Sequence, residues 1–314
     1  MLTFKHKSNF FFEQLPSYEN GYLDVGQGHK IYYEQYGNPD GKPILFLHGG
    51  PGAGFSSFHK SFFDTKVFRV IFFDQRGSGK SIPYGEIDNN NTEALILDIE
   101  NLRKHLKIKQ WYLFGGSWGS TLAILYGINF PERCLGFILR GIFLGTINEI
   151  NWFLYDMKKF FPEAHHKFLS YIPKDHQNNI LLWFYKQLNV KEKSTNLQAA
   201  AVWAEYENSC STLKYVERPM SGEKSLAIAK IETHYFLNKC FISDNFIKKN
   251  IEKIAHIPAI IVQGRHDVIC PPFNALDLSK IWNAASIDVI EDAGHSGFED
   301  SIARKLINAL YMIK

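Results

Sequence analysis

The chain has 314 residues, of which 45% are apolar and 21% are charged, with a formal net charge of +3. This is the composition of an ordinary globular protein, and the length allows one large α/β domain or one domain with an insertion. The small net charge and the lack of a dense Lys/Arg block argue against nucleic acid as a partner. The lack of any apolar run near the ~18 residues of a membrane span argues against a membrane partner.

Cysteine usage bears on the cellular compartment. The four cysteines, Cys134, Cys210, Cys240 and Cys270, are widely spaced and form no Cys-x-x-Cys pair. This pattern is typical of reduced thiols in a cytoplasmic protein and predicts neither a disulfide framework nor a metal site. The apolar patch at residues 10–12 is too short for the core of a signal peptide.

The first part of the chain, from about residue 21 to 140, alternates strand-like and helix-like segments. The predicted strands are residues 30–35, 43–47, 68–73, 111–114 and 135–139. A helix is predicted over residues 92–106 with Thr92 as its N-cap, because apolar side chains recur there at helical spacing. Strands that alternate with helices indicate a mostly parallel sheet covered on both faces.

The remainder of the chain divides in two. Residues 145–247 lose the strand pattern, and their aromatic and charged residues recur at helical spacing, which predicts an inserted helical cap. The β/α pattern then returns, with strands at residues 258–263 and 286–290 and a closing helix at 298–312. We therefore expect a core domain of residues 1–144 and 248–314 and a cap of residues 145–247.

The motif Gly-Gly-Ser-Trp-Gly-Ser at residues 115–120 lies between the predicted strand at 111–114 and a helix-like run that begins at Thr121. A Gly-x-Ser-x-Gly motif in this context is typical of the nucleophile elbow of an α/β-hydrolase. Its glycines let the strand and the helix pass close together. The context therefore predicts an α/β-hydrolase fold with Ser117 as the nucleophile.

The acid and the base of a Ser-Asp-His triad should follow the serine in that order. Asp267 comes directly after the strand at 258–263, and His295 follows the strand at 286–290. Both therefore belong at the carboxyl edge of the sheet, where the elbow also lies. His266 is a weaker base candidate because it precedes the last strand, and Asp292 is a weaker acid candidate because only three residues separate it from His295. The simpler alternative is that Asp267 and His295 are loop-capping residues.

An oxyanion hole needs two backbone donors. The Trp118 N–H, directly after the nucleophile, is the first candidate. The second should come from the glycine-rich loop at residues 48–54, in which Pro51 has no N–H and Gly50 is the predicted donor. A merely flexible turn is the alternative interpretation of this loop.

Taken together, several motifs resemble those of the prolyl aminopeptidase (proline iminopeptidase) family. They are His-Gly-Gly-Pro-Gly at 48–52, Asp-Gln-Arg-Gly-Ser-Gly-Lys-Ser at 74–81, the elbow, Leu-Arg-Gly-Ile-Phe at 139–143, and the Asp267 and His295 loops. The resemblance runs from about Tyr18 to the C-terminus. It implies a serine peptidase that releases N-terminal proline from short peptides, without a metal or organic cofactor.

The same resemblance implies that two cap glutamates recognise the free amino group of the substrate. Glu207, rather than Glu205, and Glu232 occupy the matching positions, although Tyr206 stands where the family pattern has tryptophan. Phe143 and Tyr235 are expected to line an apolar slot for the pyrrolidine ring. For the glutamates the alternative is a solvated helix face, and for the two aromatic residues it is core packing. A structural salt bridge is expected for Arg140.

Two other functions are compatible with these residues. An esterase or broader arylamidase would have the same triad and differ only in the cap. A non-catalytic binding protein could keep the fold without the chemistry. The sequence leaves a homo-oligomer open.

Overall fold

The computed structural model describes residues 10–313, and its centre is an eight-stranded sheet with the order β1-β2-β4-β3-β5-β6-β7-β8. The strands are β1 (Glu19–Gly26), β2 (His29–Gly37), β3 (Lys42–Leu47), β4 (Phe68–Phe73), β5 (Trp111–Ser117), β6 (Cys134–Ile142), β7 (Ala259–Gly264) and β8 (Ala285–Ile290). β2 pairs antiparallel with β1 and β4, and all other pairs are parallel. The predicted α/β-hydrolase fold is confirmed.

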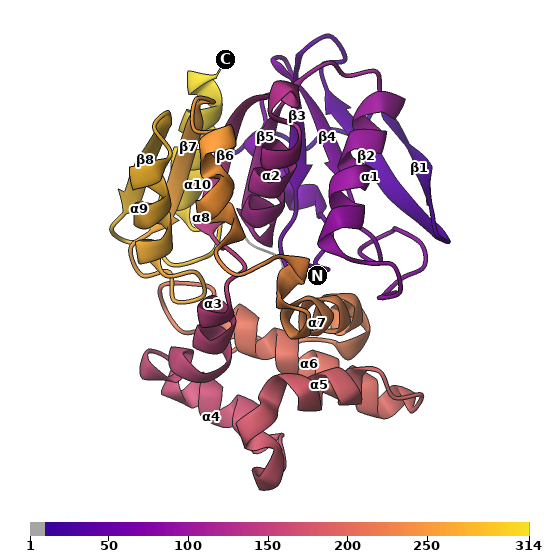
Figure 1. The fold of residues 1–314 in the computed structure, drawn as a ribbon, viewed down its shortest axis with the longest axis vertical. Coiled ribbons are helices and arrows are strands. Elements are labelled where there is room, and N and C mark those ends of the chain that lie inside the picture. The colour runs from indigo at the N-terminus through magenta and orange to yellow at the C-terminus, as the bar shows by residue number, and fades with distance from the viewer. Residues whose placement is uncertain (1–9, 314) are drawn as a thin grey trace.

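Helices cover both faces of this sheet (Figure 1). One face packs against α1 (Thr92–His105), α2 (Trp118–Asn129), α8 (Phe246–Asn250) and α9 (Pro272–Ile281). The other face packs against α10 (Asp300–Met312) and the 3₁₀ helix Ser57–Phe62. Side chains of the central strands alternate between the two faces, so that Leu45 and Leu47 join the first core and Ile44 and Phe46 the second.

The chain between β6 and α8 contains no strand and forms helices that gather at the carboxyl edge of the sheet (Figure 1). They are α3 (Ile147–Asn151), followed by a π turn at Trp152–Asp156, then α4 (Pro162–Ser170), α5 (Ile180–Leu188), α6 (Lys193–Ser209) and α7 (Gly222–Leu237). We call residues 147–237 the helical cap. Its aromatic side chains pack on one another, as Phe168 does on Tyr206 with ring centroids 4.3 Å apart.

Hydrogen bonds tie the cap to the core. Asn90, just before α1, accepts a bond from the Tyr235 hydroxyl at 3.0 Å and lies 3.0 Å through its carbonyl from His234 Nε2. On the other side of the site, the Ser211 carbonyl accepts from the backbone N–H of His295 and of Ser296. The cap is therefore held at both sides of the sheet edge that it covers.

Some sequence predictions need correction. The strand β1 was not predicted, because it is an edge strand whose side chains are only partly buried and whose pattern is weakly apolar. The N-cap of α1 is Asn91, whose side chain accepts from the Ala94 N–H, and Thr92 is the first helical residue. The outer ends of the predicted core domain, residues 1–9 and 314, lie outside the described residues.

Three further findings concern residues 10–313. No helix there has the length and apolar content to cross a bilayer. No group of three His, Cys, Asp or Glu side chains in this range is arranged to hold a metal ion. All four cysteines are free and buried.

Candidate active site

Ser117 lies at the apex of a sharp turn between β5 and α2. Its φ is 57° and its ψ is −129°, a conformation that a non-glycine residue adopts only under strain. The turn brings the start of α2 so close to the end of β3 that a side chain at Gly119 would overlap the Leu47 carbonyl. The elbow motif thus places a serine hydroxyl at the carboxyl edge of the sheet, beneath the cap.

His295 and Asp267 meet at the same edge, on the loops that follow β8 and β7. His295 Nδ1 lies 2.8 Å from Asp267 Oδ2. The carboxylate is held in turn by the Cys270 N–H at 2.8 Å and by Gln263 Nε2 at 3.0 Å. The aspartate is thus positioned by its own loop and by the strand before it.

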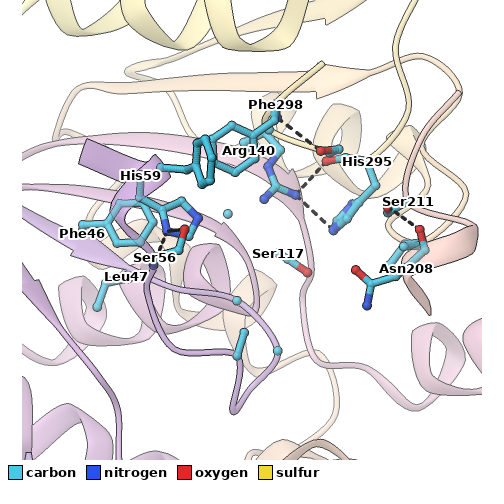
Figure 2. A pocket seen from close by; sticks show the side chains of 18 of the residues that line it. Phe46, Leu47, Ser56, His59, Ser117, Arg140, Asn208, Ser211, His295 and Phe298 are labelled. Carbon is cyan, nitrogen blue, oxygen red and sulfur yellow. Dashed lines mark hydrogen bonds between the residues drawn. The ribbon is translucent and has the colours of Figure 1, made fainter. Parts of the chain in front are cut away.

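The second imidazole nitrogen of His295 faces Arg140, at the end of β6. Arg140 Nη1 lies 3.0 Å from His295 Nε2 and donates to the His295 carbonyl at 2.9 Å (Figure 2). Because a guanidinium only donates, Nε2 must accept, and the proton of the neutral ring lies on Nδ1 beside Asp267. Among the described residues Ser117 makes no hydrogen bond to His295, so Arg140 holds the position at Nε2 that a serine would occupy in a triad.

The backbone at Gly141 lies close to the imidazole of His295. Its φ is +56°, and a Cβ built on it would lie 2.9 Å from His295 Cε1 and 3.1 Å from Nδ1. We expect Gly141→Ala to displace the ring and to lower kcat/KM by roughly 100-fold or more, since a shift of about 1 Å in a catalytic group has that effect. The measurement is the hydrolysis rate of the purified variant relative to the wild type.

Gly85→Ala is the matched control for that substitution. Gly85 also has a positive φ, +68°, but its nearest neighbours to a built Cβ are 3.9 Å away. It should share the backbone cost and keep full activity. Equal losses in both variants would mean that backbone strain, and not the contact with His295, is responsible.

The glycine-rich loop after β3 lies directly over the elbow. The Gly50 N–H donates no hydrogen bond within residues 10–313, and Gly50 lines the same cavities as Ser117. Trp118 is the first residue of α2, so its N–H has no partner one turn earlier in the helix. Both N–H groups are therefore available to a bound oxygen atom.

Gln75 braces the glycine-rich loop. Its backbone N–H donates to His48 Nε2 at 3.0 Å and its side-chain amide donates to the His48 carbonyl at 2.9 Å. The same side chain accepts from Trp118 Nε1 at 2.9 Å. Burial lowers the pKa of His48 to about 4, so this histidine is a neutral acceptor at physiological pH. Gln75 thus connects the two backbone segments that carry the candidate donors.

Two cavities meet at Ser117. The larger, of about 570 Å³, is also lined by Arg140 and His295 (Figure 2). The smaller, of about 20 Å³, is lined by Phe143, by cap residues and by Cys270. Glu232 lines only the small cavity, whereas Glu207 lines both cavities. The serine therefore lies at a boundary between two compartments of different size.

The two predicted glutamates come from neighbouring cap helices, Glu207 from α6 and Glu232 from α7. Glu232 is 2% exposed, and its Oε2 accepts from Trp203 Nε1 at 2.5 Å. Glu207 Oε2 is buried and has no hydrogen-bond partner among the described residues. Trp203 precedes Glu207 by one helical turn, so both project from the same face of α6. The two helices thus bring together two carboxyl groups, of which Glu207 has a buried oxygen that accepts no hydrogen bond from the described residues.

Burial raises the pKa of both carboxyl groups. For Glu232 the nearby charge of Glu207 adds to that effect, and for Glu207 the charge of Arg140 opposes it. The folded protein therefore keeps protons that the unfolded chain loses near the ordinary pKa of 4.5. Stability must fall as the pH rises through that value toward the raised pKa values, because charging the two carboxyl groups is unfavourable where no cation is paired with them.

A neutral replacement should remove this pH-dependent cost. We expect Glu232→Gln to melt several degrees above the wild type at pH 8, with the difference closing near pH 4.5, in thermal unfolding without substrate. The glutamine oxygen can still accept from Trp203. Glu205→Gln is the control, because Glu205 is on the same helix but is paired at 2.6 Å with the exposed Lys167. A Glu232→Gln protein less stable than the wild type at pH 8 would contradict this account.

The other predicted pocket residues differ in their positions. Phe143 lines the small cavity. Tyr235 lines neither this cavity nor the large one: it is fully buried, its hydroxyl bonds to Asn90, and its ring contacts Trp118 edge-on at 5.0 Å. Tyr235 lies three residues after Glu232 on α7, and that turn of the helix faces the core. These contacts favour the alternative of core packing for Tyr235 over a place in the apolar slot.

Arg140 also differs from expectation, since it forms no ion pair with a carboxylate among residues 10–313 and instead contacts His295. No sequence pattern singled out a role for Gly141, Gln263 or Trp203. Trp203 could have been found from its spacing of four residues before Glu207 on one helix. Gln263 and Gly141 act through space between strands that are distant in the chain, and no local pattern marks them.

Comparison with known proteins supports this fold and places the chain among its relatives. The α/β hydrolase fold family matches residues 42–302. The chain is 44% identical over 298 residues to a probable proline iminopeptidase of Leptolyngbya boryana, and the matched region covers 93% of each protein. It is 42% identical over 314 residues to a proline iminopeptidase of Arabidopsis thaliana, with 98% of this chain and 82% of that one covered. The chain belongs to the proline iminopeptidase family of α/β-hydrolases.

The fold of this chain is also similar to the solved structures of more distant hydrolases. An esterase from Exiguobacterium antarcticum superposes with a TM-score of 0.61 at 20% identity, covering 94% of this chain and 99% of that one. At this identity the likeness concerns the fold alone. The cap that covers the sheet edge is therefore where the particular function of this chain must be sought.

Proposed function

We propose that this protein is a prolyl aminopeptidase, a serine peptidase that releases N-terminal proline from short peptides. The supporting observation is the pair Glu207 and Glu232 beside a small cavity that Ser117 also lines: Glu232 is buried, and Glu207 has a buried carboxylate oxygen without a partner among the described residues. An ammonium group is the partner that such a pair lacks, because buried carboxylates are stable only when paired. Relatives at 42–44% identity are named for this activity.

The proposed chemistry divides between a nucleophile, a base and an acid that positions the base. Ser117 Oγ attacks the prolyl carbonyl carbon while His295 Nε2 accepts the hydroxyl proton. Asp267 holds Nδ1–H and stabilises the imidazolium that forms. For this step the Ser117 hydroxyl has to replace Arg140 at Nε2, as catalytic hydrogen bonds often form only once substrate is bound.

The tetrahedral intermediate carries a negative oxygen. We assign its stabilisation to the N–H groups of Gly50 and Trp118, which have no partner in the described structure. His295 then gives its proton to the leaving amine as the C–N bond breaks, which leaves a prolyl ester on Ser117. Water, activated by the same histidine, hydrolyses the ester and releases proline.

In this proposal the chain divides into a catalytic core of residues 1–144 and 248–314 and an inserted unit of residues 145–247 that contains the helical cap. The core supplies the triad and the cap supplies the two glutamates. The acyl residue lies at the mouth of the small cavity, beside Phe143, because that cavity itself holds only about one water molecule. The hydrogen bonds from Asn90 to α7 hold the cap over the site, which suits peptides with a free N-terminus better than internal segments of long chains.

The experiment that tests this function compares prolyl-p-nitroanilide with its N-acetylated form and with the alanyl and leucyl analogues. We expect turnover of the free prolyl compound and loss of turnover on acetylation, which removes the ammonium charge. Equal turnover of the acetylated compound would identify a broader amidase or esterase. Folded protein that a fluorophosphonate does not label at Ser117 would favour a non-catalytic binding protein.

A further inference from the structure

The large cavity beside Ser117, of about 570 Å³, has more volume than a proline residue alone would fill. His295 lines this cavity and does not line the small one, while Glu232 lines only the small one. The group that protonates the leaving amine must lie beside that amine. The leaving residue therefore extends from Ser117 into the large cavity, on the side of His295.

The deep wall of that cavity is aromatic and uncharged. Phe46 packs on His59 with centroids 4.6 Å apart and on Phe114 at 5.8 Å, and Phe62 lies 6.0 Å from Phe114. Burial lowers the pKa of His59 to about 3, and its Nδ1 accepts from the Ser56 N–H at 3.0 Å. This histidine is therefore neutral at physiological pH and serves as one more aromatic surface.

Positively charged side chains outnumber negatively charged ones among the described residues that line the large cavity. Arg140 and Arg218 contribute two guanidinium groups, and Glu207 is the only carboxylate among the described lining residues. Arg218 makes no ion pair within residues 10–313, and its Nη2 donates to Thr212 Oγ1 at 3.3 Å. With Glu207 engaged by the substrate ammonium, the cavity keeps an excess of positive charge.

We propose that the 570 Å³ cavity is the binding site for the residue that follows proline. It selects a residue with a large apolar side chain and a free C-terminal carboxylate. The preferred substrates are thus prolyl dipeptides such as Pro-Phe and Pro-Leu. Aromatic walls take the side chain by the hydrophobic effect, and Arg218 attracts the carboxylate. This inference rests on the proposed aminopeptidase function and names the substrates of the same site.

The test is a kcat/KM series with the wild-type enzyme on Pro-Phe, Pro-Leu, Pro-Asn and Pro-Gly. All share the acyl residue, so differences report the leaving residue. We expect Pro-Leu to exceed Pro-Asn, which is similar in size, by roughly tenfold or more, and Pro-Phe to exceed Pro-Gly by at least as much. Equal values across the series would overturn the inference while leaving the aminopeptidase function intact. No hydrolysis of any prolyl compound would overturn both.

A variant of one lining residue, with a matched control, tests whether the cavity wall selects apolar side chains. Ile228→Gln alters an α7 side chain that lines the cavity and should reduce the Pro-Leu to Pro-Asn ratio several-fold. Leu226→Gln, on the same helix but outside both cavities, should leave the ratio unchanged. An unchanged ratio in Ile228→Gln, or an equal fall in both variants, would contradict an apolar selection at this wall.

Arg218→Gln tests the recognition of the carboxylate, with Pro-Phe compared against Pro-Phe-amide. The wild type should prefer the free carboxylate, and the variant should lose most of that preference while it keeps its activity on the amide. Lys214→Gln removes an exposed positive charge from the same segment without altering a lining residue, and it should retain the preference. No preference in the wild type would overturn this half of the proposal.

Discussion

Replacing Ser117 by alanine should lower kcat/KM for prolyl-p-nitroanilide by about 10⁴-fold to 10⁶-fold, the loss found when a serine nucleophile is removed. The strained turn that carries Ser117 also tolerates alanine, so the variant should fold and melt close to the wild type. Kinetics and thermal unfolding of the same preparation measure both effects.

The other two triad residues provide a second readout. If Ser117, His295 and Asp267 act as one unit, adding His295→Ala to Ser117→Ala should cause little further loss. A double variant that loses activity in proportion to the two single losses would mean that His295 acts separately from Ser117. In that case the 2.8 Å contact between His295 and Asp267 would have another role.

Neutralising either cap glutamate should have the next largest effect, and that effect should depend on the substrate. We expect Glu207→Gln and Glu232→Gln each to lower kcat/KM for the free prolyl substrate by roughly 30-fold or more, the loss typical of one partner of a buried charge pair. The preference for the free over the N-acetylated substrate should shrink with it. The same kinetic series measures both quantities.

Glu205→Gln is the control for this pair, because it lies on α6 two residues before Glu207 and pairs outward with Lys167. Its kcat/KM should match the wild type. A loss in Glu205→Gln as large as in Glu207→Gln would point to a general effect of charge on the cap. The predicted gain in stability of Glu232→Gln at pH 8 separates loss of function from loss of fold.

The sheet, and the position of Ser117, Asp267 and His295 at one edge of it, could be predicted from sequence because both follow local rules. A strand followed by a glycine-flanked serine defines the elbow, and residues just past parallel strands must meet at one sheet edge. Asp267 and His295 lie 28 residues apart in the chain and 2.8 Å apart in space for that reason. The strand β1 lacked such a signal because its half-exposed side chains alternate weakly.

The cap was less predictable. Nothing local distinguishes Glu207 and Glu232 from solvated helix glutamates, and only the resemblance to a family singled them out. The orientation of Tyr235 depends on how α7 packs on the core, which the helix pattern alone does not determine. The contact from Arg140 to His295 depends on two loops that are distant in sequence and could not be inferred from either.

The buried pair of glutamates also affects what the enzyme exchanges with its surroundings. Burial by itself favours the protonated forms of Glu207 and Glu232. An ammonium group that settles beside them favours the charged forms, so each binding event should expel a proton into the solvent. The apparent affinity for a prolyl peptide should then rise with pH until the substrate amine itself loses its charge. Binding in this protein would thus be an exchange of one cation for another.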